Sequence, residues 1–173
     1  MNNFSKTVTG IALALATSTS LAGTLGDDSS DTSLVTLEVT DKVQISNISN
    51  IPMGEYNGTD ATWSDGTSYC VFRNGGDQYR LKLTTDEGAF QVASATTGDT
   101  IPFTAQVDSD ADASDGAAIA YDAWSANMNG ASATDCSGAD NGSIEVTFTQ
   151  ANLLAVSSGS DYKATITVFV EPI

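Results

Sequence analysis

The sequence of 173 residues contains no histidine and only six lysines and arginines. Without histidine the chain has no Ser-His-Asp triad, and it lacks the commonest general base and the commonest transition-metal ligand. The six basic residues face 22 acidic ones, which gives a formal net charge of −16. Binding to nucleic acid or to an anionic lipid surface is therefore disfavoured by electrostatic repulsion.

Hydrophobic runs long enough to cross a membrane are also missing, because such a helix needs about 20 apolar residues. The run Val8–Ala16 is short; it follows Lys6 and precedes small residues at 20–22. This pattern is typical of a secretory signal peptide with cleavage after Ala22. We therefore expect an exported protein with no membrane span in its mature chain.

Cysteine is scarce, and Cys70 and Cys136 are the only two. In an exported protein such a pair is expected to form a disulfide. The loop that this bond closes is long, so the chain-entropy model gives roughly 4 kcal/mol of stabilisation. Two cysteines without a histidine make a poor metal site.

The acidic residues offer little basis for catalysis. They fall in loops of small residues, with no neighbouring apolar pocket that would raise the pKa of one carboxyl above that of another. We therefore expect no enzymatic activity and no cofactor.

The densest acidic group spells DSDADASDG and offers alternating oxygen donors at Asp108, Asp110 and Asp112. Such donors suit Ca²⁺, which takes six to eight oxygen ligands. The match to a calcium-binding EF-hand loop is partial, because Ala113 and Ile119 stand where that loop has glycine and glutamate. We interpret the group first as a solvated acidic loop, with a calcium site as the alternative.

What the sequence does contain is short alternating segments. The clearest is residues 162–170 (YKATITVFV), where apolar and polar side chains alternate until Phe169. Residues 34–45 (LVTLEVTDKVQI) alternate in the same way except at Asp41, which predicts one strand or two strands hinged at 40–42. Further short strands are expected at 69–72, 79–84, 90–92, 101–107 and 144–148, the first two as a hairpin, with one helical turn within 150–156. Seven to nine short strands without a long helix predict an all-β fold, an immunoglobulin-like antiparallel β-sandwich.

The two ends of the mature chain carry a family resemblance. Residues 23–33 form a small, acidic, flexible leader, an amphipathic strand follows it, a turn stands at 51–54 (IPMG), and SGSDY precedes the closing TITVFV. Together these features resemble exported fimbrial subunits of the bacterial chaperone–usher class, including the spore-coat-U-like and CS1-like branches. The chain departs from that pattern in its cysteine positions, in Pro172, and in a Gly159-to-Tyr162 spacing that is one residue longer.

The resemblance implies a sandwich that lacks its last strand. A periplasmic chaperone would lend a strand first, and the N-terminal extension of another subunit would replace it. The implied donor strand carries Val35, Leu37 and Val39, and the implied acceptor groove carries Ile166, Val168 and Val170. The chain would then comprise a signal peptide (1–22), a leader with the donor strand (23–41) and a pilin-like domain (42–173). Its partners would be a chaperone, an outer-membrane usher and further subunits, in an extracellular fimbria that supports adhesion or biofilm formation.

A second interpretation needs no partner copy. Residues 34–40 would lie beside 162–170 of the same chain and close a self-contained, secreted β-sandwich with a binding or adhesin-like role. In that case Trp63, Tyr121 and Trp124 would be the exposed aromatic contact surface. The sequence leaves both interpretations open.

Overall fold

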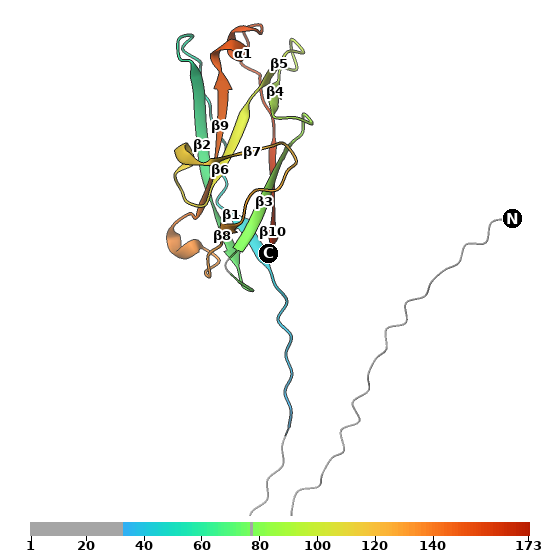
Figure 1. Cartoon of the computed structure of the whole chain (residues 1–173). Helices are drawn as coiled ribbons and strands as arrows, with labels where there is room; N and C mark the ends of the chain where they lie inside the picture. The colour runs from blue at the N-terminus through green and yellow to red at the C-terminus, as the bar shows by residue number, and fades with distance from the viewer. Residues whose placement is uncertain (1–32, 77) are drawn as a thin grey trace, which may run out of the picture. The chain divides into compact units, whose positions relative to one another are not determined.

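The computed structural model describes residues 33–76 and 78–173, so the predicted signal peptide and the start of the leader lie outside the described residues. The chain divides between Glu38 and Val39, and every strand belongs to the second part (Figure 1). The described residues form ten strands: β1 Val43–Ser46, β2 Thr62–Arg73, β3 Gln78–Thr85, β4 Gln91–Ala93, β5 Thr100–Pro102, β6 Thr104–Asp108, β7 Ala117–Ile119, β8 Met128–Asn129, β9 Gly142–Thr149 and β10 Ile166–Pro172. The one α-helix among them, α1 Gln150–Leu154, is a short turn within the predicted range.

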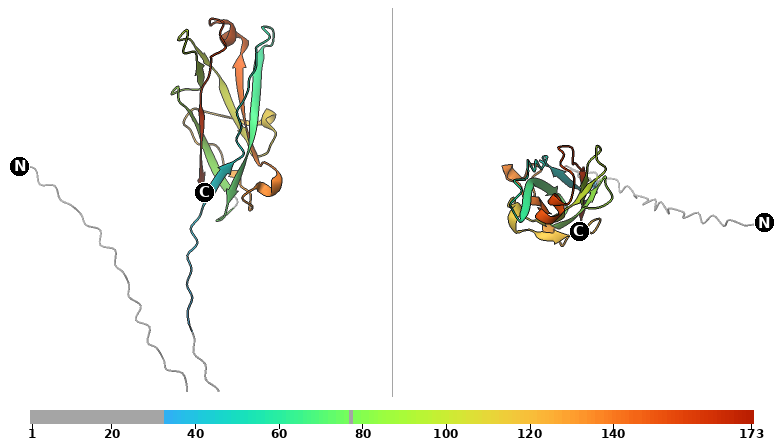
Figure 2. Two further views of the ribbon diagram at one scale, coloured as in Figure 1. Left: turned by 180° about the vertical axis from the view of Figure 1, so that it is seen from behind. Right: turned by 90° about the horizontal axis from the view of Figure 1, so that it is seen from above.

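The strands form two main sheets that face each other (Figure 2). The first has the order β1-β2-β9-β6-β7 and the second the order β10-β3-β8, while β4 and β5 form a small ribbon. All paired strands are antiparallel. The predicted all-β antiparallel sandwich is therefore confirmed.

Alternation explains how these strands meet in one core. Ile144, Val146 and Phe148 of β9 are buried on one side of the core, and Leu81 and Leu83 of β3 are buried on the other. The residues between them along each strand are polar and face away, as a period of two requires. Burying each such aliphatic side chain contributes about 1.5–3 kcal/mol.

The predicted hairpin between 69–72 and 79–84 is wrong, because β2 and β3 belong to different sheets. Arg73 ends β2 and is almost fully buried. Its guanidinium group donates to the carboxylate of Asp41 and to the backbone carbonyl of Gln78. These bonds hold the chain where it crosses from one sheet to the other.

Residues 54–67 are rich in turn-forming residues, yet strand β2 already begins within this range. It starts at Thr62 and pairs with β9 along eight residues. Gly66 permits this pairing, because a Cβ atom at this position would lie 2.6 Å from the carbonyl oxygen of Ile144. The glycine is therefore a close-approach residue inside a strand and not part of a turn.

The strand directions define two ends of the sandwich. We call the end that holds Arg73 and Ile173 the base, and the end that holds α1 the top (Figure 1). At the base, the backbone N–H of Ile173 donates to the carbonyl of Gln78 at 3.2 Å. Strand β10 runs from top to base, since Ile166 pairs with Thr85 and Pro172 with Tyr79, whereas β1 and β9 run from base to top.

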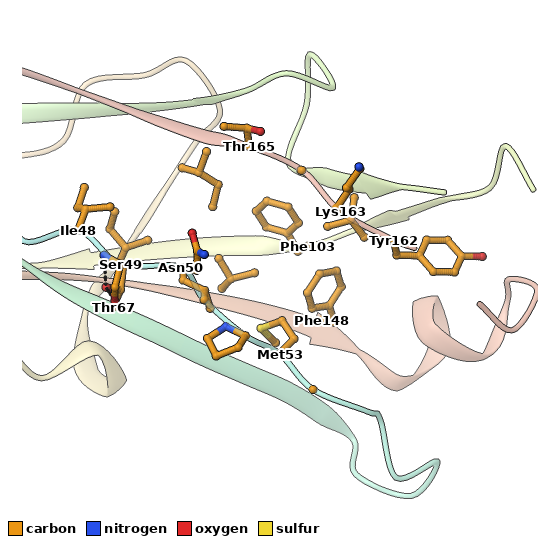
Figure 3. Close-up of a pocket in the computed structure, with 18 of the residues that line it drawn as sticks. Ile48, Ser49, Asn50, Met53, Thr67, Phe103, Phe148, Tyr162, Lys163 and Thr165 are labelled. Atoms are coloured by element: carbon orange, nitrogen blue, oxygen red, sulfur yellow. Dashed lines mark hydrogen bonds between the residues drawn. The ribbon is translucent and has the colours of Figure 1, made fainter. Parts of the chain in front are cut away.

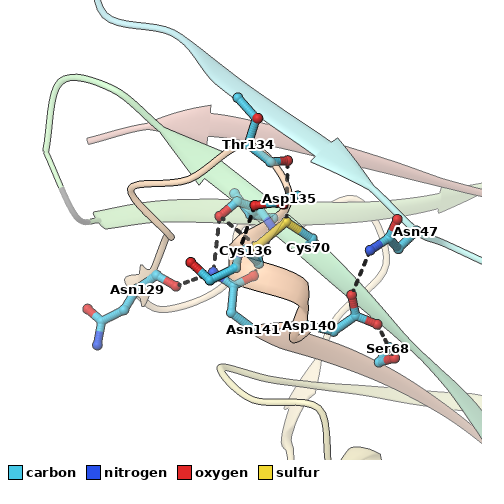
Figure 4. Close-up of a disulfide and its surroundings, with 11 residues drawn as sticks. Asn47, Ser68, Cys70, Asn129, Thr134, Asp135, Cys136, Asp140 and Asn141 are labelled. Atoms are coloured by element: carbon cyan, nitrogen blue, oxygen red, sulfur yellow. Dashed lines mark hydrogen bonds between the residues drawn. A yellow bond between two sulfur atoms is a disulfide. The ribbon is translucent and has the colours of Figure 1, made fainter.

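The predicted disulfide is confirmed, with 5.8 Å between the Cα atoms of Cys70 and Cys136 (Figure 4). It ties β2 to a 3₁₀ turn within the irregular region that precedes β9. Beside it, the side-chain amide of Asn141 pairs with the backbone of Val71, accepting from its N–H at 2.7 Å and donating to its carbonyl at 3.0 Å. The irregular region is thereby fixed to the first sheet.

Candidate functional site

The second sheet ends at β10, whose neighbour on one side is β3. Among the described residues, no strand pairs with residues 166–172 on the other side. The facing sheet ends at β1, which has only four residues. A hydrophobic strand with an unpaired edge is a template for another strand, and proteins normally cover or interrupt such an edge.

Strand β1 is short because the chain turns away from β2 at Asn47. This residue has a φ of 67°, in the left-handed region that asparagine tolerates better than most residues. Its side-chain amide donates to Asp140 at 2.9 Å, and Asp140 also accepts from the hydroxyl of Ser68 (Figure 4). These two donors hold the pKa of Asp140 below its ordinary value.

Residues 48–54 then continue without a strand partner in the described part of the chain. The backbone N–H of Ser49 donates instead to the side-chain oxygen of Thr67 at 3.2 Å. The indole N–H of Trp63 donates to the carbonyl of Met53 at 2.7 Å. The segment is thus held beside the first sheet by side chains.

An open groove of about 540 Å³ lies between residues 48–54 and the segment 162–168, which leads into β10 (Figure 3). Phe103 and Phe148 lie between the two walls in this view. The apolar side chains that line the groove are Ile48, Ile51, Met53, Val92, Phe103, Ile144, Val146, Phe148, Ile166 and Val168.

The predicted acceptor residues are only partly the ones that line this groove. Ile166 and Val168 line it and are half-buried. Val170 is also half-buried and packs against the core, but it lies nearer the base and is not part of the lining. The sequence interpretation missed the wall formed by residues 48–54 and the floor formed by Phe103 and β9. The signal for the wall was present in Asn47 and Pro52, since neither residue favours a continuing ladder.

A second cavity of about 500 Å³ adjoins the groove toward the top. Met53, Phe148 and Tyr162 line both spaces, so the two are adjacent. Tyr162 is positioned by its hydroxyl, which donates to the carbonyl of Ser157 at 2.7 Å. An extended segment in the groove would therefore meet an open apolar space at the top.

The predicted donor residues are all exposed to solvent. Val35, Leu37 and Val39 have exposed fractions of 87%, 86% and 73%. Residues 33–42 contain no strand, so the predicted strand at 34–45 is correct only over residues 43–45, which belong to β1. Without a neighbouring strand, an alternating segment cannot form the interstrand hydrogen bonds that define a strand.

The three aromatic residues of the second interpretation lie on different elements. Trp63 is half-buried on β2 and supports residues 48–54 as described above. Tyr121 is half-buried, with its ring edge-on to Phe90. Trp124 is 37% exposed and lies beside β3, where the guanidinium carbon of Arg80 is 4.9 Å from its ring centre.

The acidic loop DSDADASDG brings three of its carboxylates together. Oxygen atoms of Asp108, Asp110 and Asp115 lie within 4.8 Å of one another. Asp112 instead caps the short turn Ala113–Asp115 by accepting from the backbone N–H of Ser114 at 3.0 Å. The nearby Asp108 raises the pKa of Asp115. A hydrogen bond to the Asp108 carboxylate, together with its charge, favours the protonated form of Asp115.

No helix among the described residues is both long and apolar enough to span a membrane. No protein-family model and no curated protein matches the chain. A similar chain occurs in a solved structure of a chaperone–tip adhesin complex that is described as vital for synergistic activation of CFA/I fimbriae biogenesis. The two chains are 13% identical, with a TM-score of 0.45 over 76% of this chain and 41% of the other. This chain therefore spans less than half the length of that one.

Proposed function

We propose that this chain is an exported structural subunit of an extracellular fimbria, in which the leader of one copy adds a strand to β10 of another copy. One observation carries the proposal. The chain has an open strand edge beside an apolar groove, and it also has an alternating apolar segment that is almost fully exposed. The open edge has no neighbouring strand in the described residues, and the exposed segment has no strand to pair with.

The interaction would be β-strand addition. The leader backbone would form ladder hydrogen bonds with the free edge of β10, and alternate side chains would enter the groove. Ile144, Val146 and Phe148 follow one another at two-residue intervals along the groove floor, which is also the spacing of the leader's three exposed aliphatic residues, Val35, Leu37 and Val39. Burial of a valine or leucine side chain contributes about 1.5–3 kcal/mol. Three such contacts would make dissociation slow.

The position of the leader's attachment favours one orientation. Asp41 is bound to Arg73, so the leader joins the sandwich at the base. In a head-to-tail row of copies, the base of one meets the top of the next, and the leader enters that groove from the top. It then runs antiparallel to β10, which is the slightly more stable pairing. A head-to-tail interface that does not close into a ring gives an open filament.

The groove would be open before assembly, and an exposed apolar edge promotes aggregation. This supports a role for a periplasmic chaperone that covers β10 until another leader replaces it, with an outer-membrane usher as the site of exchange. Adhesion or biofilm formation would follow from the filament at the cell surface.

The test is a denaturing gel of unheated samples, prepared from the mature chain after refolding. We expect a ladder of multimers from the full mature chain and none from a chain that lacks residues 23–40. Leu37→Asp should also abolish the ladder, because it places a charge in the groove. Thr36→Asp is the matched control, since its side chain belongs to the opposite face of the same segment. A truncated chain that still forms the ladder would refute the proposal.

A further inference from the structure

The root of the leader, residues 40–42, is held by an unusually complete set of contacts. The side-chain amide of Asn74 donates to the carbonyl of Thr40 at 3.1 Å and accepts from the N–H of Lys42 at 2.6 Å. The backbone N–H of Asn74 also donates to the carbonyl of Lys42 at 3.2 Å. One side chain thus pairs with the backbone on both sides of Asp41.

This pairing requires an extended chain at Asp41. In a strand, the carbonyl of one residue and the N–H of the second residue after it point to the same side, so a single amide reaches both. The carboxylate of Asp41 is fixed as well, because the buried guanidinium of Arg73 donates to it at 2.6 and 3.2 Å. Gly75 packs against this carboxylate, and a Cβ atom there would lie 2.4 Å from Asp41 Oδ1.

A leader that filled its own groove would have to break this arrangement. Strand β1 starts at Val43 and runs from base to top, so the leader would have to reverse direction at Asp41 and Lys42. Two-residue hairpins require positive φ angles that suit Asn-Gly or Asp-Gly, and lysine is poorly suited to them. The reversed leader would also run parallel to β10, which is the less stable pairing.

We infer that Arg73, Asn74 and Gly75 act as a clamp that prevents the leader from filling its own groove and so reserves the groove for another copy. The inference rests on the proposed function. It assigns Asp41 and Asn74 a positioning role, because neither residue lines the groove. The clamp acts by holding the leader root extended.

Two variants test the clamp in the full mature chain. Asn74→Ala removes the amide pairing, and Asp41→Asn combined with Lys42→Gly creates a favourable hairpin sequence. For each variant we expect about a tenfold fall in the ratio of multimer to monomer, equivalent to about 1.4 kcal/mol. We also expect the backbone amides of residues 34–39 to become protected from hydrogen exchange in the remaining monomer. Asn127→Ala is the matched control. Asn127 is also exposed, but its side-chain amide donates to the side chain of Gln78 and not to the backbone of the leader.

The outcomes separate this inference from the function that it rests on. If the unaltered chain forms no multimers, the proposed function fails. If it forms multimers and both variants do so equally well, with unprotected leaders in their monomers, the clamp is refuted. Dilute monomer of the unaltered chain provides a test that needs no variant: its leader amides should exchange at the rate of an unstructured peptide, and protection there would also refute the clamp.

Discussion

The two alternating segments at the ends of the mature chain have the same sequence pattern and opposite surroundings. In β10, Ile166 and Val168 are half-buried against the core and hydrogen-bonded strand pairing exists on one side. In the described part of the leader, residues 33–41, Val35 and Leu37 are more than four-fifths exposed and no strand forms. Alternation therefore predicts a face that needs a cover, but it does not tell whether the same chain provides that cover.

The largest expected effect is the loss of sandwich stability when the disulfide is removed. Both of its cysteines lie in the sandwich and neither lies in the leader. Replacing Cys70 and Cys136 by serine should destabilise the sandwich by about 4 kcal/mol, because the bond restricts a long loop in the unfolded chain. Chemical denaturation of the monomer measures this loss. Proteolysis of the leader in the folded monomer should proceed at an unchanged rate. A slower leader cleavage in the intact protein than in the variant would show that the leader is packed on the sandwich.

An aspartate substitution in β10 and one in the leader should change the stability of the monomer differently. Val168→Asp should cost the monomer about 2 kcal/mol, because it places a carboxylate on the wall of an apolar groove. Leu37→Asp should leave the melting temperature of the monomer unchanged, since its side chain is already exposed. Differential scanning calorimetry of dilute samples compares the two. Equal destabilisation would mean that the leader contributes to the monomer fold.

Acid should destabilise the segments beside the groove, because hydrogen bonds there favour the charged form of two carboxyl groups. Hydrogen bonds from Asn47 and Ser68 lower the pKa of Asp140, and bonds from Ser94 and Thr96 lower that of Asp161, both below 3.8. A lowered folded-state pKa contributes stability above the unfolded value and loses it as pH falls through the folded value. Melting temperature should therefore decline below about pH 4. Asp140→Asn should make this decline shallower, and an unchanged slope would contradict the role of Asp140.

The smallest effect is expected on the outer face of β10. Phe169 is exposed there, and the Lys82 ammonium lies 5.4 Å from its ring centre. Phe169→Thr should cost about 0.5–1 kcal/mol in monomer stability, the value of an exposed cation–π contact. Multimer formation should be unaffected, because the side chain points away from the groove. A lost ladder would show that the outer face of β10 also takes part in assembly.

Much of the sandwich was predictable from the sequence, because period-two burial shows directly in the residue pattern. The strands around Leu81 and Ile144 and the disulfide were predicted correctly, and the predicted strand at 162–170 is correct from Ile166 onward. The crossing from β2 to β3 was not predicted, since it depends on Arg73 binding Asp41, which is distant in sequence. The wall at residues 48–54 was also missed: Asn47 and Pro52 indicate that a ladder does not continue there, but they do not indicate that the segment lies opposite β10.

Crosslinking between isotopically distinct copies tests the central claim most directly. Equal amounts of heavy and light mature chain, each with a photoreactive phenylalanine analogue in place of Leu37, are refolded together, irradiated and digested. The account predicts crosslinks from Leu37 to peptides that contain Ile166 or Val168, with heavy–light pairs as frequent as heavy–heavy and light–light pairs combined. Crosslinks to β10 that join only peptides of the same isotope would show that each chain fills its own groove, and would contradict assembly by strand addition.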